Sequence, residues 1–230
     1  MGTDAFELIL VHFLSIKIHV WMSFEYFSII PITHNIFLFT DYSTERVLNI
    51  LNNELADTLG NLVNRCTGKV VNPSGEIPSA SIYAKTLKSE SAENLRKNLE
   101  SLGDTAKQHY ESFYIHHAVD SIMATLRSAN QMVEHHKPWQ LVKEADDKLK
   151  TAELKGVLSL AMETTRVCAL ALTPVTPKLS SKLLDTLNVP LEARTWKDTK
   201  PKYLREEQGT ESEQFKSGRG LLFPKIKLNA

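Results

Sequence analysis

Two polar residues four positions apart could read the edge of an unpaired nucleotide base. Asn61 and Arg65 are separated by about one helical turn, so in a helix their side chains share one face. An Asn amide both donates and accepts hydrogen bonds, whereas an Arg guanidinium offers a planar fork of donors. Together they match the hydrogen-bonding edge of a base. The spacing alone favours an ordinary surface pair, because such pairs are common on helices.

A tryptophan that directly follows a proline offers a second binding element. Trp139 comes after Pro138, and a proline cannot continue a hydrogen-bonded helix interior, so the pair marks a helix break. A ring held there is a rigid platform, and base-on-aromatic stacking is worth about 1–3 kcal/mol per base. The flanking His136, Lys137 and Lys143 would suit phosphates. The alternative is a ring packed into the core beside the kink, as most Trp side chains are.

The remaining reactive residue types form no catalytic or metal-binding pattern. Cys66 and Cys168 lie in helix-like apolar stretches without the Cys or His spacing of a zinc site, so both are expected to be reduced core residues. His116 and His117 are adjacent, so they point to different helix faces and cannot easily share a metal. Residues 216–220 resemble a phosphate loop only in composition. We expect no catalytic residue and no metal site.

The composition is that of an ordinary globular domain. The 230 residues are 42% hydrophobic and 23% charged, with nine Gly and nine Pro that cluster rather than scatter. Long helices are therefore favoured over strands and turns. The formal net charge is zero and gives no support for a nucleic-acid partner, although a local basic stripe can still bind phosphates.

Apolar residues recur at helical spacing along most of the chain. The expected helices cover about residues 41–68, 91–103, 105–135, 151–172 and 177–187. Gly103 is expected to end the second helix, and Pro177 to begin the last. Residues 71–78 are typical of a loop, and the alternation of Ile226 and Leu228 suits a short strand. We predict an all-α, antiparallel bundle of about four or five helices with an irregular C-terminal tail.

Three segments of different character follow one another. Residues 1–40 form an apolar N-terminal extension with six of the nine Phe and no Arg, unlike an Arg-rich transit peptide. Charged residues, histidines and Pro31 interrupt every stretch long enough to span a membrane, so we do not expect insertion. Residues 41–187 are the expected bundle, and residues 188–230 are the tail with its closing Leu-Phe-Pro segment.

Four ordered motifs resemble one family of class I aminoacyl-tRNA synthetases. Residues 53–65 look like the opening helix of the anticodon-binding domain of methionyl-tRNA synthetases, and residues 136–141 resemble its Pro-Trp segment. Residues 172–177 and 220–224 are similar to its later helix break and closing segment. The resemblance covers about residues 41–228 and is strongest to the mitochondrial form, which lacks an appended C-terminal module.

The resemblance implies roles for the residues singled out above. In this family an Asn and an Arg one turn apart, and a Trp after a Pro, recognise the CAU anticodon of methionine tRNA. By motif position these are Asn61, Arg65 and Trp139, with Pro138 setting the ring. Trp139 would stack on the wobble cytosine while Asn61 and Arg65 bond its edge, as single-stranded loops are commonly read. The three flanking basic side chains become weaker candidates for tRNA backbone contacts.

The resemblance is to one half of the family's protein only. The His-x-Gly-His and Lys-Met-Ser-Lys-Ser loops that bind ATP in its catalytic half do not occur in this sequence. We therefore expect no site for ATP or methionine, no methionine–tRNA ligase activity by this chain alone, and methionine tRNA as partner of a monomer. The resemblance implies the mitochondrial matrix, with the cytoplasm as the alternative location. The alternative function is a non-catalytic helical interaction module, tethered to a membrane through residues 1–40; exposure of the Trp139 ring would argue against it.

Overall fold

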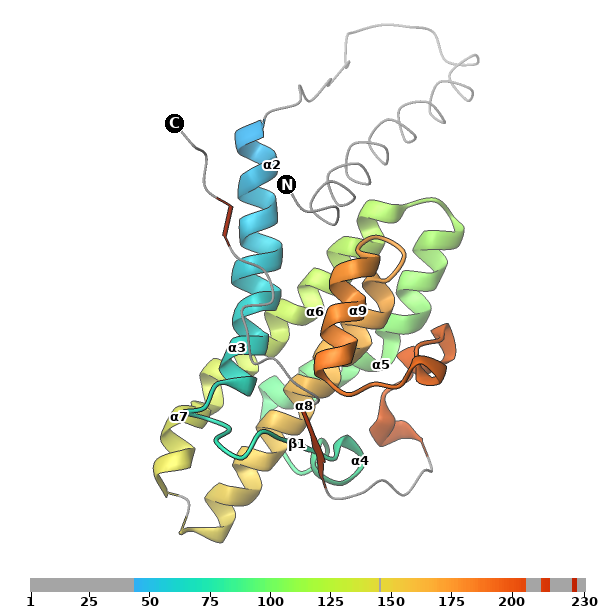
Figure 1. Cartoon of the computed structure of the whole chain (residues 1–230). Helices are drawn as coiled ribbons and strands as arrows, with labels where there is room; N and C mark the ends of the chain where they lie inside the picture. The colour runs from blue at the N-terminus through green and yellow to red at the C-terminus, as the bar shows by residue number, and fades with distance from the viewer. Residues whose placement is uncertain (1–43, 145, 206–211, 216–224, 227–230) are drawn as a thin grey trace, which may run out of the picture.

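Residues 44–144, 146–205, 212–215 and 225–226 are described by a computed structural model, and they form a bundle of helices (Figure 1). The α-helices are α2 (Thr44–Leu51), α3 (Asn61–Thr67), α4 (Ala80–Tyr83), α5 (Glu90–Glu111), α6 (Ile115–His136), α7 (Pro138–Leu141), α8 (Lys148–Leu172) and α9 (Pro177–Thr186). The π-helix η2 (Asn52–Gly60) joins α2 to α3, and the 3₁₀ turns are η3 (Val142–Glu144), η4 (Leu191–Ala193), η5 (Trp196–Thr199) and η6 (Lys202–Leu204). Two short strands are β1 (Glu76–Pro78) and β2 (Ser212–Gln214). This architecture confirms the all-α prediction, while the expectations for residues 1–40, 220–224 and Leu228 lie outside the described residues.

Helix α8 is the axis of the bundle. Every residue from Gly156 to Leu172 is buried, as expected of a helix that has neighbours on all sides. Helices α3, α4, α5, α6 and α9 all pack against it. The continuous α2–η2–α3 rod crosses α6 and α8 at one side of the bundle, and the α5–α6 pair lies alongside (Figure 1). Helix α9 begins at Pro177, as predicted, and α7 begins at Pro138, where the sequence predicted only a helix break.

The predicted boundaries of two helices, 91–103 and 105–135, are wrong. The stretch 105–135 is not one helix, because the chain turns between α5 and α6 at Phe113, whose backbone has φ 60°. Gly103 does not end a helix but lies inside α5. A Cβ atom at Gly103 would lie 2.5 Å from the Thr199 side-chain oxygen. Glycine is therefore needed for the close approach of η5 rather than for a helix end.

The tail is also more regular than expected. Strand β2 pairs antiparallel with β1, Ile77 opposite Glu213, although 71–78 was predicted as a loop. Ile226 is not part of a strand: its backbone N–H donates to the Asn52 side-chain oxygen at 2.9 Å, and its carbonyl accepts from the Asn52 amide nitrogen at 2.9 Å. The Asn52 side-chain amide on the α2–η2–α3 rod thus bonds the backbone N–H and carbonyl of Ile226, which a neighbouring strand would otherwise pair.

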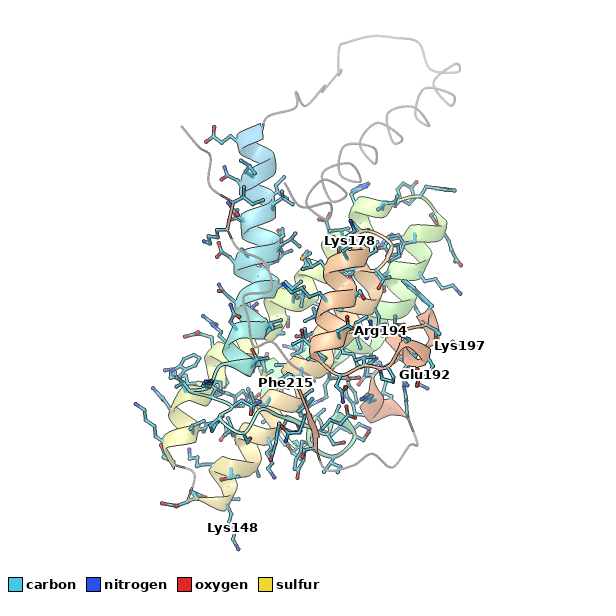
Figure 2. All side chains as sticks on the ribbon, in the orientation of Figure 1. Lys148, Lys178, Glu192, Arg194, Lys197 and Phe215 are labelled. Atoms are coloured by element: carbon cyan, nitrogen blue, oxygen red, sulfur yellow. The ribbon has the colours of Figure 1, made fainter. Side chains whose placement is uncertain are left out.

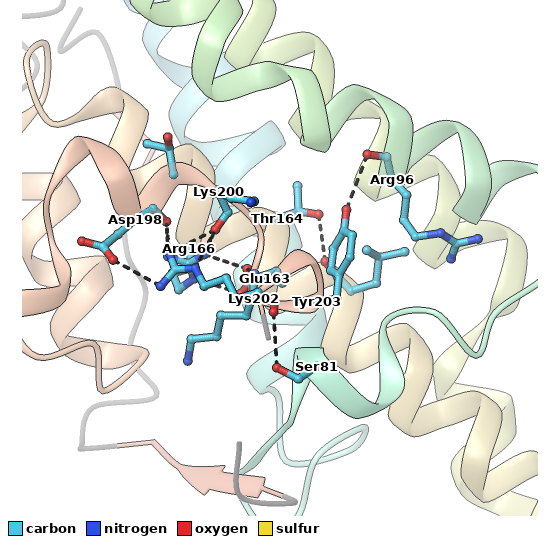
Figure 3. Close-up of polar contacts among 12 residues, drawn as sticks. Ser81, Arg96, Glu163, Thr164, Arg166, Asp198, Lys200, Lys202 and Tyr203 are labelled. Atoms are coloured by element: carbon cyan, nitrogen blue, oxygen red, sulfur yellow. Dashed lines mark hydrogen bonds and ion pairs between the residues drawn. The ribbon is translucent and has the colours of Figure 1, made fainter. Parts of the chain in front are cut away.

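A buried ion pair fastens the segment 198–202 to α8. The Arg166 guanidinium donates to both carboxylate oxygens of Glu163, at 2.9 Å and 2.7 Å, and to the Asp198 carbonyl at 2.7 Å (Figure 3). The backbone N–H of Lys202 donates to Glu163 at 2.6 Å. Burial alone would raise the pKa of Glu163, but Arg166 and these hydrogen bonds together hold it below its ordinary value. The attraction between the two charges and their hydrogen bonds offset the free energy that each charge loses when it is removed from water.

Replacing Gly103 with alanine tests the close approach of η5 to α5. Overpacking costs about 1–3 kcal/mol, which exceeds the roughly 1 kcal/mol that alanine gains over glycine in a helix. We expect a net loss in the free energy of unfolding, measured by urea denaturation. Because the clash is with Thr199, adding Thr199→Ala should make Gly103→Ala less costly than it is alone. A single variant more stable than the wild type would contradict the observed packing.

Candidate nucleic-acid interface

The rod that carries Asn61 and Arg65 is braced by its neighbours. Both residues lie in α3, directly after the π-helical segment, and such segments are rare and often occur at functional sites. From α6, the Asn130 side chain donates to the carbonyl of Thr58 at 2.9 Å. At the other side Lys225 forms an ion pair of 2.8 Å with Asp57. These contacts fix the rotation of the rod just before α3 begins.

Trp139 is set by a one-residue reversal of the chain. Lys137 has left-handed backbone angles, φ 48° and ψ 61°, and ends α6 while it starts α7. Its carbonyl accepts from the N–H of Gln140 at 2.8 Å. Pro138 and Leu141 are buried, and this anchors α7 from one side. The Trp139 ring packs partly against the core and stays partly exposed, which is the half-supported position that a stacking platform requires.

The fold brings Arg65 and Trp139 together from elements far apart in the sequence. The Arg65 guanidinium carbon lies 6.0 Å from the centroid of the Trp139 ring, within the range of a cation–π contact. Arg65 also forms an ion pair of 3.2 Å with Glu134 in the last turn of α6. The Asn61 side chain is exposed, one turn before Arg65 on the same helix.

Glu134 is the residue of this site that the sequence did not indicate. It lies within the basic stretch before Pro138, but its place beside Arg65 depends on how α3 crosses α6. No local pattern predicts that crossing. Its carboxylate offsets the charge of Arg65 and holds the guanidinium near the Trp139 ring.

The three flanking basic residues take two different positions. Lys137 and Lys143 are exposed. The His136 ring instead points inward and its side chain is only 7% exposed. Its two nitrogens lie 2.8 Å from the Ser89 hydroxyl and 2.7 Å from the Glu153 carboxylate. A ring with both nitrogens bonded inside the bundle has no free donor for a phosphate, so His136 is a poorer candidate for a tRNA backbone contact than Lys137 and Lys143.

Neither a membrane span nor a metal cluster is found where the structure describes the chain. No helix among these residues is long and apolar enough to cross a bilayer. No group of at least three His, Cys, Asp or Glu side chains among them could hold a metal ion. The thiols of Cys66 and Cys168 are buried, and burial raises the pKa of both.

Taken together, the fold and these side chains define a helical domain that carries a partly exposed aromatic ring, a guanidinium and an exposed amide, which are groups typical of proteins that bind single-stranded nucleic acid. Residues 82–228 match the family described as the anticodon binding domain of methionyl tRNA ligase, and the chain belongs to this family.

Relatives and solved structures agree with that assignment. The chain is 32% identical over 198 residues to the mitochondrial methionine–tRNA ligase of Homo sapiens. The aligned region covers 81% of this chain and 33% of the human protein. The Mus musculus protein of the same name is 33% identical over 200 residues, with 81% and 33% covered. The free form of Mycobacterium tuberculosis methionyl-tRNA synthetase has the same fold, with a TM-score of 0.69 at 24% identity over 81% of this chain and 35% of that chain. The chain thus spans about a third of the length of the curated relatives it matches.

Proposed function

We propose that this chain recognises the CAU anticodon of methionine tRNA, as the tRNA-binding part of a methionine–tRNA ligase. The observation that carries the proposal is the pairing of Arg65 with the partly exposed Trp139 ring. Family membership supports a tRNA partner, and the resemblance of the motifs supplies the individual roles. The relatives named as mitochondrial enzymes favour the mitochondrial matrix as the location.

In the proposed complex the first anticodon base, cytosine, stacks on Trp139. One side of the ring is supported by the core, so the ring needs little ordering when a base arrives. Stacking is tolerant of base identity, because every base has a π-face. The choice of cytosine therefore rests on the groups that meet its edge.

Arg65 supplies most of that choice. A guanidinium donates hydrogen bonds and cannot accept them. The N3 atom of cytosine is an acceptor, whereas N3 of uracil carries a hydrogen and is a donor. Arg65 can therefore bond N3 of cytosine but not N3 of uracil, because two donors cannot form a hydrogen bond. Asn61 can rotate its amide and adapt to either base, which makes it a weaker discriminator. Glu134, 3.2 Å from Arg65, holds the guanidinium near the Trp139 ring before the base arrives.

The direct test is binding of the purified chain to methionine tRNA and to the same tRNA with the first anticodon base changed from cytosine to uracil. At low salt we expect a preference for cytosine of about 5- to 150-fold, equivalent to the roughly 1–3 kcal/mol of a good bidentate base contact. Equal affinity for the two tRNAs would overturn the proposal. Binding of neither, by a sample with helical circular dichroism, would favour the helical interaction module instead.

Lys137 and Lys143 are proposed to contact the tRNA backbone near this site. Changing Lys143 to glutamine should lower the affinity for both tRNAs by the same factor, because a phosphate contact carries no base information. The slope of log affinity against log salt should fall by about 0.7–0.9 for one lost phosphate contact. Lys197→Gln is the matched control: Lys197 is exposed, on the side of the bundle opposite α7 (Figures 1 and 2), and its loss should change neither quantity. An unchanged salt slope in the Lys143 variant would remove this residue from the interface.

A further inference from the structure

The turn that presents Trp139 has a backbone conformation that needs support. Lys137 is a non-glycine residue with φ 48° and ψ 61°, in the left-handed region that L-amino acids rarely adopt, because Cβ approaches the following carbonyl oxygen. Such conformations persist where the surrounding structure determines them. On its C-terminal side the turn is held by buried Pro138. On its N-terminal side the adjacent residue is His136.

The His136 ring ties three helices together at this point. The Ser89 hydroxyl, 2.8 Å from Nε2, belongs to the N-cap of α5, and Glu153, 2.7 Å from Nδ1, lies in α8. A carboxylate only accepts, so Nδ1 donates to Glu153; in the neutral ring Nε2 then accepts from Ser89. Ser89 in turn accepts from the backbone N–H of Ala92 at 3.3 Å. The hydrogen bonds therefore form one chain, in which Ala92 donates to Ser89, Ser89 to His136 and His136 to Glu153.

We propose that His136 is a positioning residue for the anticodon site. It holds the Lys137 reversal, and through it the Trp139 ring, at the distance from Arg65 that lets one base stack and be read at its edge. This inference rests on the proposed function, and it gives His136 a role that is neither contact with tRNA nor catalysis.

Two other roles for the same side chains fit the geometry less well. The order Ser89, His136, Glu153 is that of a hydrolase triad, but the serine hydroxyl already serves as the cap of α5 by accepting from Ala92. A phosphate contact would need a ring nitrogen that faces solvent, and the His136 side chain is 7% exposed. Positioning is the role that uses both ring nitrogens as they are found.

The experiment compares His136→Ala with His135→Ala in the full chain. His135 is the adjacent residue in the last turn of α6 and its side chain is exposed, so its variant removes one imidazole without cutting the Ser89–Glu153 link. For each protein the affinities for the cytosine and uracil tRNAs are measured at several salt concentrations. Helical content is checked by circular dichroism.

We expect His136→Ala to lower the preference for cytosine by about tenfold, because a displaced Trp139 ring no longer aligns the stacked base with Arg65, with an unchanged salt slope. His135→Ala should keep the wild-type preference. Because His136→Ala could unfold the chain, Glu153→Gln provides a second variant: its amide oxygen still accepts from Nδ1, so it should keep most of the preference, whereas Glu153→Ala should lose it.

The outcomes separate this inference from the proposed function. If the wild type itself shows no preference for cytosine, the proposed function fails. If the wild type prefers cytosine and folded His136→Ala does so equally, the positioning role is overturned. An equal loss of affinity for both tRNAs would also overturn it, and a lower salt slope in that case would indicate a phosphate contact instead.

Discussion

Replacing Arg166 with leucine should lower the free energy of unfolding by about 3–5 kcal/mol, because it leaves a buried carboxylate without its counterion. Glu163 and Arg166 are 4% exposed each, so water cannot replace the lost partner. The variant also removes the donor to the Asp198 carbonyl, although Arg205 still donates to that oxygen at 3.0 Å. Urea denaturation at pH 7.5, followed by circular dichroism, measures the loss.

The stability lost in Arg166→Leu should increase with pH. In the wild type the pKa of Glu163 is lowered overall, so its contribution is present above the ordinary carboxyl pKa and is lost as pH falls through the lower folded value. Without Arg166, burial dominates and the pKa of Glu163 rises. That variant loses stability as pH rises through the raised pKa. The cost of Arg166→Leu should therefore be smaller at pH 5 than at pH 7.5.

The double variant Glu163→Leu/Arg166→Leu is the control for the buried charge. Apolar replacements of a whole buried ion pair are often neutral or stabilising, so most of the stability should return. The backbone N–H of Lys202 loses its acceptor, which should leave a deficit of about 1–3 kcal/mol. If Arg166→Leu cost no more than the double variant, the charge argument would be wrong.

Trp139→Ala should weaken binding of methionine tRNA by about 1–3 kcal/mol, which is about 5- to 150-fold in affinity. The ring is the stacking surface of the proposed site, and it is only partly buried. The loss of stability should therefore fall short of the roughly 3–5 kcal/mol of a fully buried Trp→Ala change. Trp139→Phe keeps an aromatic face and should retain most of the affinity.

Trp196→Ala is the matched control for the loss of a large ring. Trp196 lies in η5 and packs edge-on against Tyr110, with ring centroids 6.0 Å apart, away from α7. Its removal should reduce stability without changing the affinity for methionine tRNA. If Trp139→Ala instead lowered the melting temperature strongly and left tRNA affinity unchanged, the ring would be a core residue only.

The sequence predicted well the features that depend on neighbouring residues. Pro177 begins a helix as expected, and the predicted helix break falls directly before Pro138, because proline acts on its own turn. The shared face of Asn61 and Arg65 follows from a spacing of four within α3. Family resemblance, rather than spacing, connected that face with Trp139, and the structure now places Arg65 beside the ring.

The features that the sequence did not predict depend on contacts between distant segments. Nothing local marks the turn at Phe113, because residues with positive φ are usually Gly or Asn. The role of Gly103 appears only when η5 packs on α5. The inward orientation of His136 requires Ser89 and Glu153 from two other helices, and a basic residue beside a helix break is equally typical of a phosphate contact.

The enclosure of α8 sets a hierarchy of motion in the domain. A helix surrounded from Gly156 to Leu172 can expose its amide protons to solvent only when the whole bundle opens, so their exchange with deuterium should be the slowest. Helix α7 has four residues and is anchored from one side, so it can open locally at far lower free energy. A bound base would then slow exchange in α7 and leave α8 unchanged, which means that the domain can admit and release its ligand without disturbing its axis.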